Sequence, residues 1–240
     1  MKTLGFIGMG NMAGAIAAGI LQKGLMKKEE VFAYAPHYEK LEANAEKIGF
    51  VPCKDLKGLT AKADTLVMAC KPYQIEGVLS EIKEELKGKA LISIAAGWND
   101  KYEEYLDKST RFQFIMPNTP AMVGEGVLLF EEKNSLLPEE REEIKKLFEA
   151  LGIVIELPVH LMGIGGALTG CGPAFVDLII EALGDAGVKY GVPRKQAYEM
   201  VSQMIIGSAK LQLETGEHPG VLKDNVCSPA GTTICGVDAL

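Results

Sequence analysis

The first part of the chain constrains the fold more than any other segment. Residues 3–7 (TLGFI) are a short apolar run typical of a buried strand, and residues 11–23 (NMAGAIAAGILQK) have the apolar spacing of a helix that ends at Gly24. Residues 8–13 (GMGNMA), which have the form GxGxxA, lie between them. A strand, this loop and a helix in that order predict the first unit of a Rossmann-type dinucleotide-binding domain.

Each small residue of this loop has a physical role. Gly8 permits the tight turn, Gly10 lets a pyrophosphate approach the backbone, and Ala13 allows the helix to pack closely on the strand. The helix N-terminus at Asn11 and Met12 offers free N–H groups and the positive end of the helix dipole to the phosphates. The alternative is that the glycines serve only a turn, but the strand before the loop and the helix after it favour cofactor binding.

The end of the second predicted strand indicates which cofactor is bound. An NAD site places a carboxylate there to hold the ribose hydroxyls, whereas residues 33–37 of this chain read AYAPH. Nothing at that point repels a 2′-phosphate, and His37 or Lys40 could approach it. The pattern therefore favours NADPH, with NADH still possible, and places Pro36 and His37 at the site. The alternative is that His37 and Lys40 are only exposed residues of a loop and a helix start.

The rest of the chain divides into two parts. Short apolar runs alternate with amphipathic segments to about residue 158, which predicts a parallel sheet with helices on both faces. Beyond that point only helical spacing remains, so we expect a Rossmann-type α/β domain over residues 1–158 and an all-helical domain over residues 159–240. The further expected strands are 31–35, 65–70, 90–95, 112–116, 127–130 and 153–157, with a brief apolar step at 50–53; the further expected helices are 38–48, 73–86, near 100–107, 138–150, 172–190, 193–214 and 230–240.

Composition excludes several classes of function. The net charge of −7 gives a surface that repels phosphate backbones, so we expect no nucleic-acid partner. The five cysteines form no CxxC pair and the three histidines do not stand at zinc-ligand spacing near them, so we expect free thiols and no metal site. The apolar run at the N-terminus is too short for a signal peptide, and no stretch approaches the length of a membrane span. We therefore expect a cytoplasmic protein without membrane contact.

Four later segments are difficult to explain as scaffold alone. Lys71 and Pro72 follow directly on strand 65–70, at the carboxyl edge where open α/β sheets bind ligands. Residues 116–120 (MPNTP) follow another strand at the same edge. Residues 170–174 (GCGPA) are expected to open the long helix, and residues 223–233 (KDNVCSPAGTT) to open the last one.

Together with the GxGxxA loop, these segments resemble the pyrroline-5-carboxylate reductase family. Cys171 stands where a serine is usual, and Ala230 stands where a glycine is usual, which can restrict its loop. Family members usually continue further, so Leu240 is expected to be a truncation or the end of an unusually short form. The matching segments run in order from residue 5 to residue 233 and are GFIGMGNM, KP, SIAAG, MPNTPA with VGEG, GCGPAF and HPGVLKDNVCSPAGTT.

The resemblance implies the reduction of 1-pyrroline-5-carboxylate to L-proline, the last step of proline biosynthesis, by hydride transfer from NAD(P)H. It also implies that the helical domain interlocks with a second copy, as a homodimer or a larger homo-oligomer. Asn118 either orients a ligand or belongs to a rigid turn, Lys71 either contacts the cofactor or is solvated, and Asn44 is either a surface residue or reaches the adenosine end. The further cofactor-binding residues that the resemblance implies are Ala69, Cys70, Lys71, Pro72, Ala95, Ala96 and Gly97.

The reaction needs a hydride at the imine carbon and a proton at nitrogen. The imine nitrogen can already be protonated, so a strong protein acid is not required. We hypothesise that the Thr233 hydroxyl hydrogen-bonds the nitrogen, and that the turn formed by Ser228, Gly231 and Thr232 holds the carboxylate with backbone N–H groups and the helix dipole. The alternative is that these hydroxyl groups are ordinary helix N-caps.

Two other functions fit parts of the pattern. A hydroxyacid dehydrogenase or imine reductase of similar layout is one, but such dehydrogenases use a lysine in the helix that opens the second domain, and residues 171–188 contain none. A non-catalytic NADP-binding regulator is the other. It would bind the cofactor without turnover, which an assay of NADPH loss with and without the imine detects.

Overall fold

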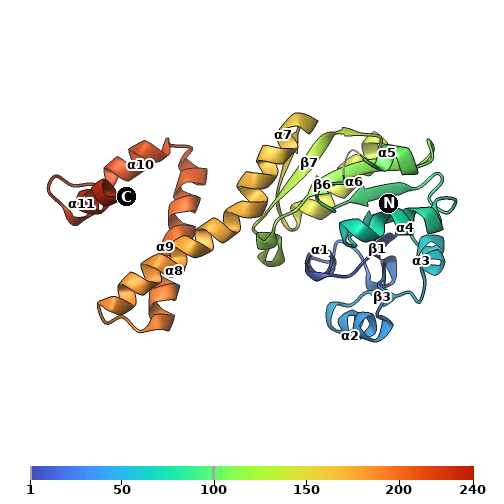
Figure 1. The fold of residues 1–240 in the computed structure, drawn as a ribbon, viewed down its shortest axis with the longest axis horizontal. Helices are drawn as coiled ribbons and strands as arrows, with labels where there is room; N and C mark the ends of the chain where they lie inside the picture. Colours follow the sequence, from blue (N-terminus) through green and yellow to red (C-terminus); the bar gives the residue numbers. More distant parts are fainter. Residues whose placement is uncertain (1, 99–100) are drawn as a thin grey trace. The chain divides into compact units, whose positions relative to one another are not determined.

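The computed structural model describes residues 2–98 and 101–240 (Figure 1). The chain forms two compact units, Met1–Pro173 and Ala174–Leu240. The first is a Rossmann-type α/β unit and the second is entirely helical, so the predicted fold class is confirmed.

One eight-stranded sheet organises the first unit, with the strand order β3-β2-β1-β4-β5-β6-β7-β8. Because β1 pairs with both β2 and β4, the order reverses beside β1. Open α/β sheets bind ligands at such a reversal, outside the carboxyl ends of the strands. The strands are Leu4–Ile7 (β1), Val31–Tyr34 (β2), Val51–Pro52 (β3), Thr65–Met68 (β4), Ala90–Ser93 (β5), Arg111–Met116 (β6), Gly126–Asn134 (β7) and Gly152–Leu157 (β8).

The sheet is not wholly parallel, which corrects the sequence prediction. β7 runs antiparallel to β6 and parallel to β8, while the other pairs are parallel. Residues 117–125 connect β6 to β7 through a single 3₁₀ segment, η3 (Thr119–Val123). A parallel pair requires a crossover of a dozen or more residues, so this connection permits only an antiparallel return.

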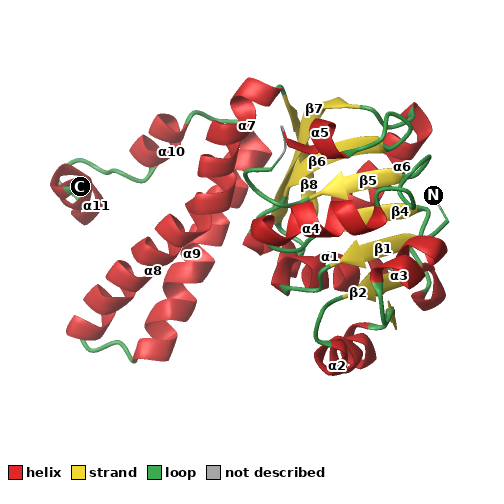
Figure 2. Ribbon diagram, turned by 45° about the vertical axis from the view of Figure 1, so that its right-hand side comes forward, coloured by secondary structure: helices red, strands yellow, loops and turns green. Residues whose placement is uncertain are grey.

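Helices cover both faces of the sheet (Figure 2). Leu4 and Phe6 of β1 pack with α1, α2 and α6 on one face, whereas Ile7 packs with α3, α4 and α5 on the other. This division follows from the pleat, which points successive side chains to opposite faces. The helices are Asn11–Gln22 (α1), Tyr38–Ile48 (α2), Leu56–Lys62 (α3), Pro72–Ile82 (α4), Tyr102–Tyr105 (α5) and Pro138–Glu149 (α6), with a short 3₁₀ turn at Lys28–Glu30 (η1).

A continuous helix of 31 residues, Val159–Lys189, follows the sheet. It consists of α7 (Val159–Gly166), a π segment η4 (Ala167–Cys171) and α8 (Gly172–Lys189). Residues 170–174 therefore lie inside a helix and do not open it, contrary to the sequence prediction. The expectation that no stretch approaches the length of a membrane span is also wrong by length and composition. An 18-residue stretch of this helix has a mean hydropathy of 1.5, and only 6% of that stretch is buried.

The second unit is built around a helical hairpin. The ring of Tyr198 in α9 lies over Gly184 in α8, where a Cβ atom would come within 2.5 Å of the ring. Two short helices follow, and Lys223, Asp224 and Asn225 belong to the first of them, so the expectation that this segment opens the last helix is corrected. Helices α3, α7 and α10 extend the predicted set. The helices after α8 are Arg194–Thr215 (α9), Pro219–Asn225 (α10) and Thr232–Ala239 (α11).

Candidate active site

The loop between β1 and α1 has a shape that only glycine permits at its first position. Gly8 has a φ of +94°, in the region that side chains rarely adopt, and its N–H donates to the Tyr34 carbonyl at 2.8 Å. A Cβ atom on Gly8 would lie 2.8 Å from the Cys70 backbone nitrogen. The tight turn is therefore also the place where the chain after β1 approaches the chain after β4.

Gly10 has a different role from Gly8. It is the N-cap of α1 with no side-chain cap hydrogen bond, and a Cβ atom placed on it would meet no heavy atom within 4 Å. The space over the helix N-terminus is thus open, and the first N–H groups of the helix have no capping side chain. Ala13, which is 1% exposed, packs behind the loop. This arrangement fits a pyrophosphate on the helix N-terminus.

A cleft of about 510 Å³ opens at the carboxyl ends of β1, β2 and β4. Most of the residues predicted to bind the adenosine half and the phosphates line it together: Gly8, Gly10, Pro36, His37, Asn44, Ala69, Cys70 and Lys71. The wall from α4 was not predicted and consists of Gln74, Gly77, Val78 and Glu81. These four positions share one helix face, with the spacing i, i+3, i+4 and i+7.

The charges of the cleft are mainly basic on the side of α2. Its ionisable lining includes His37, Lys40 and Lys71, with the carboxylate of Glu81 on α4. Burial raises the pKa of the Cys70 thiol to about 11, so this side chain is neutral at physiological pH. Cys70 is therefore a small uncharged part of the cleft wall.

The other predicted cofactor residues lie outside this cleft. Asn11, Met12 and Ala13 belong to α1, and Pro72 is the first residue of α4. Ala95, Ala96 and Gly97 follow the carboxyl end of β5, where Gly97 has a φ of +76°. The Ser93 hydroxyl, which precedes them, bonds the buried Tyr102 hydroxyl at 2.8 Å and accepts from the Ala95 N–H at 3.2 Å. This segment is therefore held in place by the core beneath it.

Asn118 is committed to bonds within the chain and does not line the cleft. Its side chain is 6% exposed, with Oδ1 accepting from the Val127 N–H at 2.9 Å and Nδ2 donating to the Thr169 carbonyl at 2.9 Å. Of the two interpretations of Asn118, the rigid turn describes these contacts. The acceptor Thr169 lies in the π segment, far along the sequence from Asn118.

The predicted substrate turn lies at the start of α11. Gly231 is the N-cap, its N–H donates to the Ser228 carbonyl at 3.0 Å, and it offers no side-chain cap bond. Thr232 and Thr233 are exposed in the first turn, and neither hydroxyl has a hydrogen bond among the residues that the structure describes. The alternative that these hydroxyl groups cap the helix therefore does not describe the turn.

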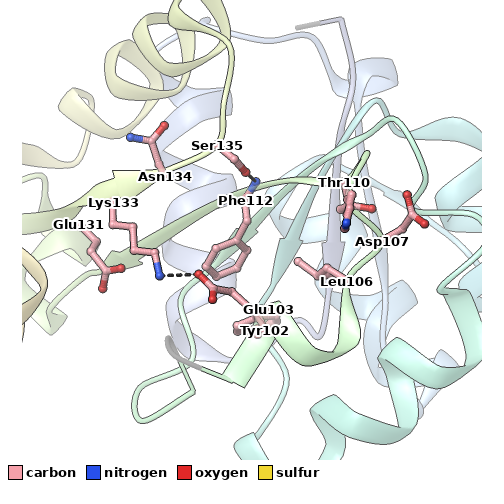
Figure 3. A pocket seen from close by; sticks show the side chains of 11 residues that line it. Tyr102, Glu103, Leu106, Asp107, Thr110, Phe112, Glu131, Lys133, Asn134 and Ser135 are labelled. Carbon is pink, nitrogen blue, oxygen red and sulfur yellow. Dashed lines mark hydrogen bonds and ion pairs between the residues drawn. The ribbon is translucent and has the colours of Figure 1, made fainter.

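A second cavity, of about 260 Å³, lies at the amino end of β6 and is lined in part by α5 and β7 (Figure 3). An ion pair between Lys133 and Glu103 spans it. The Ser135 hydroxyl accepts from the Phe112 N–H at 2.8 Å, and the Thr110 hydroxyl donates to the Leu86 carbonyl at 3.0 Å. These groups bond to one another or to the main chain, at the sheet edge opposite the nucleotide cleft.

Family models match both parts of the chain. Residues 160–240 match the model described as pyrroline-5-carboxylate reductase dimerisation, and residues 3–97 match the one described as NADP oxidoreductase coenzyme F420-dependent. The pyrroline-5-carboxylate reductase of Treponema pallidum is 38% identical over 99% of this chain and 92% of its own length. That of Escherichia coli is 38% identical over 100% of this chain and 90% of its own.

Solved structures agree with these relatives. The NADP-bound pyrroline carboxylate reductase of Plasmodium falciparum superposes with a TM-score of 0.90 at 35% identity, covering 100% of this chain and 89% of that one. The Coxiella burnetii pyrroline-5-carboxylate reductase gives 0.89 at 30% identity, covering 99% and 89%. An imine reductase from Myxococcus stipitatus, with a TM-score of 0.58 and 19% identity over 90% and 78%, shares the fold alone.

Proposed function

The chain belongs to the pyrroline-5-carboxylate reductase family, and on that premise we propose which cofactor it prefers and which of its residues carry the reaction. It is an oxidoreductase that reduces 1-pyrroline-5-carboxylate to L-proline with NAD(P)H, a reaction of proline biosynthesis. The observation that carries this function is the full-length similarity to reductases of that name. The open, uncapped helix N-terminus beside Gly10 supports it, because this feature suits a dinucleotide.

NADPH is the preferred cofactor in our proposal. The end of β2 and the loop after it, residues 33–37, carry no carboxylate, and His37 and Lys40 line the cleft on that side. A 2′-phosphate placed there meets positive charge without repulsion, whereas a ribose hydroxyl finds no carboxylate to bind. When bound, the cofactor supplies the hydride. The chain's own contribution on this side is to hold and orient it through Gly8, Gly10 and Asn44.

Substrate binding and proton handling belong to the turn before α11. Backbone N–H groups at the start of that helix suit the substrate carboxylate, since helix N-termini attract anions. The exposed hydroxyl of Thr233 is available to hydrogen-bond the imine nitrogen, and Ser228, Gly231 and Thr232 shape the turn. Most of the rate enhancement then comes from holding the imine carbon in position.

The protein works as a soluble homodimer or larger homo-oligomer in the cytoplasm. The match to a dimerisation model over residues 160–240 and the exposed apolar faces of α8 and α9 support this proposal. A second copy is a better cover for these faces than a bilayer, because the relatives are biosynthetic enzymes with a small-molecule substrate.

A cofactor-oxidation assay tests the activity directly. The purified protein should oxidise NADPH when 1-pyrroline-5-carboxylate is added and should form proline, with a higher kcat/KM for NADPH than for NADH. Ala35→Asp should lower kcat/KM for NADPH by roughly tenfold or more while affecting NADH less, because the new carboxylate repels the 2′-phosphate. Ala35 is suited to the test because it lines the cleft at the end of β2.

The outcomes separate the possible functions. Cofactor binding without turnover would identify a regulator and reject the enzyme. Turnover with a preference for NADH, or an equal loss for both cofactors in Ala35→Asp, would show that residues 35–37 do not face the 2′-phosphate.

A further inference from the structure

Two contacts fasten the end of β6 and the residues after it to the helix Val159–Lys189, one at the π segment η4 and one at Gly166, the last residue of α7. Asn118 donates from Nδ2 to the Thr169 carbonyl at 2.9 Å. Two residues earlier, Met116 packs so closely on Gly166 that a Cβ atom there would lie 2.4 Å from the Met116 sulfur. Both contacts come from residues 116–118, which lead from the end of β6 to η3.

A π segment is an uncommon structure that needs support. Its wider winding interrupts the regular i→i+4 ladder, and such segments occur frequently at functional sites. Here the Thr169 hydroxyl donates to the Gly165 carbonyl at 2.9 Å, and the Thr169 carbonyl accepts from Asn118. Asn118 therefore supports the irregular winding from outside the helix, with an amide that is 6% exposed and whose other end is held by the Val127 N–H.

The position of η4 relative to the sheet indicates the functional role of the bond between Asn118 and Thr169. The nucleotide cleft occupies the carboxyl ends of β1, β2 and β4, where the adenosine half and the pyrophosphate fit. A dinucleotide that crosses the carboxyl edge beside β1 extends its other half toward β5 and β6. Asn118 is the second residue after β6, so η4 is held at the edge that the nicotinamide half must reach.

We propose that Asn118 is a positioning residue, which keeps η4 wound as a π segment and seated at the carboxyl end of β6 beside the nicotinamide end of the site. This proposal rests on the proposed function. Asn118 acts through Thr169, because both ends of its amide are already bonded to the main chain, at Thr169 and Val127. Its removal should therefore weaken catalysis and leave the binding of the adenosine half unchanged.

The variant Asn118→Asp tests the bond selectively. A carboxylate still accepts from the Val127 N–H but can no longer donate to the Thr169 carbonyl. We expect kcat to fall by roughly 10- to 100-fold, as misplacement by about an ångström does, with an unchanged Kd for 2′,5′-ADP measured by calorimetry. Amide hydrogen exchange over residues 165–173 should become faster. The ratio of variant to wild-type kcat should rise as the pH is lowered, because a protonated carboxyl can donate again.

Gln113→Glu is the matched control. Gln113 is a fully buried amide on β6 whose Nε2 donates to the Phe114 and Glu131 carbonyls, both at 2.8 Å, at a distance from the carboxyl edge. It should lose stability as Asn118→Asp does, without faster exchange over residues 165–173 and with kcat per folded molecule close to that of the wild type. If Asn118→Asp does not fold, Thr169→Val tests the support of η4 directly, since it removes the hydroxyl bond from Thr169 to the Gly165 carbonyl of α7 and leaves the Asn118 bond in place. Its exchange over residues 165–173 should become faster and its kcat should fall, and an unchanged kcat beside faster exchange would overturn the proposal.

Three results would overturn the proposal: an unchanged kcat in the folded variant, a Kd for 2′,5′-ADP that rises together with the loss of kcat, or a kcat ratio that does not respond to pH. Failure of the proposed function looks different. In that case the wild-type protein does not turn over the imine, while hydrogen exchange over residues 165–173 still reports whether Asn118 holds η4.

Discussion

Thr233 carries a hydroxyl that is exposed in the first turn of α11. The N-cap position of α11 belongs to Gly231, so the helix does not use the Thr233 side chain as its cap. If the hydroxyl serves the transition state, Thr233→Ala should lower kcat by roughly 10²- to 10³-fold, as the loss of one oxyanion-hole donor does, with little change in NADPH affinity. Steady-state kinetics and a thermal melt on the same variant measure the two effects. An unchanged kcat beside a lowered melting temperature would remove Thr233 from the mechanism.

Ala230 shows strain in the same turn. Its φ of +57° makes it the one non-glycine residue with positive φ in the described part of the chain. That conformation costs an alanine roughly 1–2 kcal/mol, partly offset by the greater freedom of glycine in the unfolded chain. Ala230→Gly should therefore raise the free energy of unfolding by up to about 1 kcal/mol in a urea titration. Ala209→Gly, inside α9, should lower it by about 1 kcal/mol; a decrease in both would show that Ala230 is not strained.

At the scale of elements, the ion pair between Glu140 and Arg111 is one of those that tie α6 to the sheet. The Glu140 carboxylate accepts from Arg111 Nε and Nη2 on β6, both at 2.7 Å, and from the Leu137 N–H at 3.1 Å. The hydrogen bonds from Arg111 hold the pKa of Glu140 below its ordinary value. The stabilisation is therefore complete above the unfolded pKa of about 4.3 and is lost as the pH falls through the lower folded pKa.

Glu140→Gln should lower the free energy of unfolding by about 1–3 kcal/mol at pH 7, and its difference from the wild type should shrink as the pH falls below about 4. Urea titrations over that pH range measure both effects. Glu142→Gln on the same helix, where an exposed carboxylate pairs with Lys145 at 3.5 Å, should change stability by less than about 1 kcal/mol. A deficit in Glu140→Gln that stays constant with pH would contradict the assignment.

The sequence predicts elements well where local pattern and packing agree. The sequence alone predicts β1, β2, β4, β5 and β6, because strands that are buried on both faces of a sheet appear in the sequence as nearly continuous apolar runs. Helix α3 was missed because its seven residues include Gly58 in the first turn; its signal is Asp55, whose carboxylate accepts from the Gly58 N–H at 2.6 Å. Helix α7 (VHLMGIGG) contains weak helix formers, and it is helical because it docks on β7 and β8.

The candidate site also has parts that the sequence predicts and parts that depend on packing. The GxGxxA loop is a local signal, and the cleft lies where that signal places it. The wall formed by Gln74, Gly77, Val78 and Glu81 depends on how α4 packs, which a motif does not report. The sequence alone could not decide the role of Asn118, because its partner Thr169 lies 51 residues further along the chain. The two residues come together through the antiparallel return of β7 and the helix that follows the sheet.

At the scale of the whole molecule, the second unit leaves large apolar surfaces uncovered. Phe175 and Leu178 of α8 are 63% and 65% exposed, and Met200 and Leu213 of α9 are 64% and 74% exposed. Such patches mark protein interfaces, and closed homo-oligomers bury them against a second copy. Sedimentation velocity at micromolar concentration should show a dimer or a larger species, and Leu178→Glu should shift it toward monomer. A wild-type protein that sediments as a clean monomer would contradict this expectation.

The continuous helix Val159–Lys189 also governs how the two halves can be dissected into separate fragments. The dimerisation match begins at residue 160, but the compact sheet unit extends to Pro173. Met162 of α7 completes a small core with Phe114 and Leu129 of the sheet. A fragment that ends at residue 159 would lack Met162, so Phe114 and Leu129 would be exposed to water and the fragment would tend to aggregate. A fragment that ends at Pro173 keeps Met162 and the rest of α7 packed on the sheet. The boundary of the family match and the boundary of the folded unit therefore lie at different residues, 160 and 173.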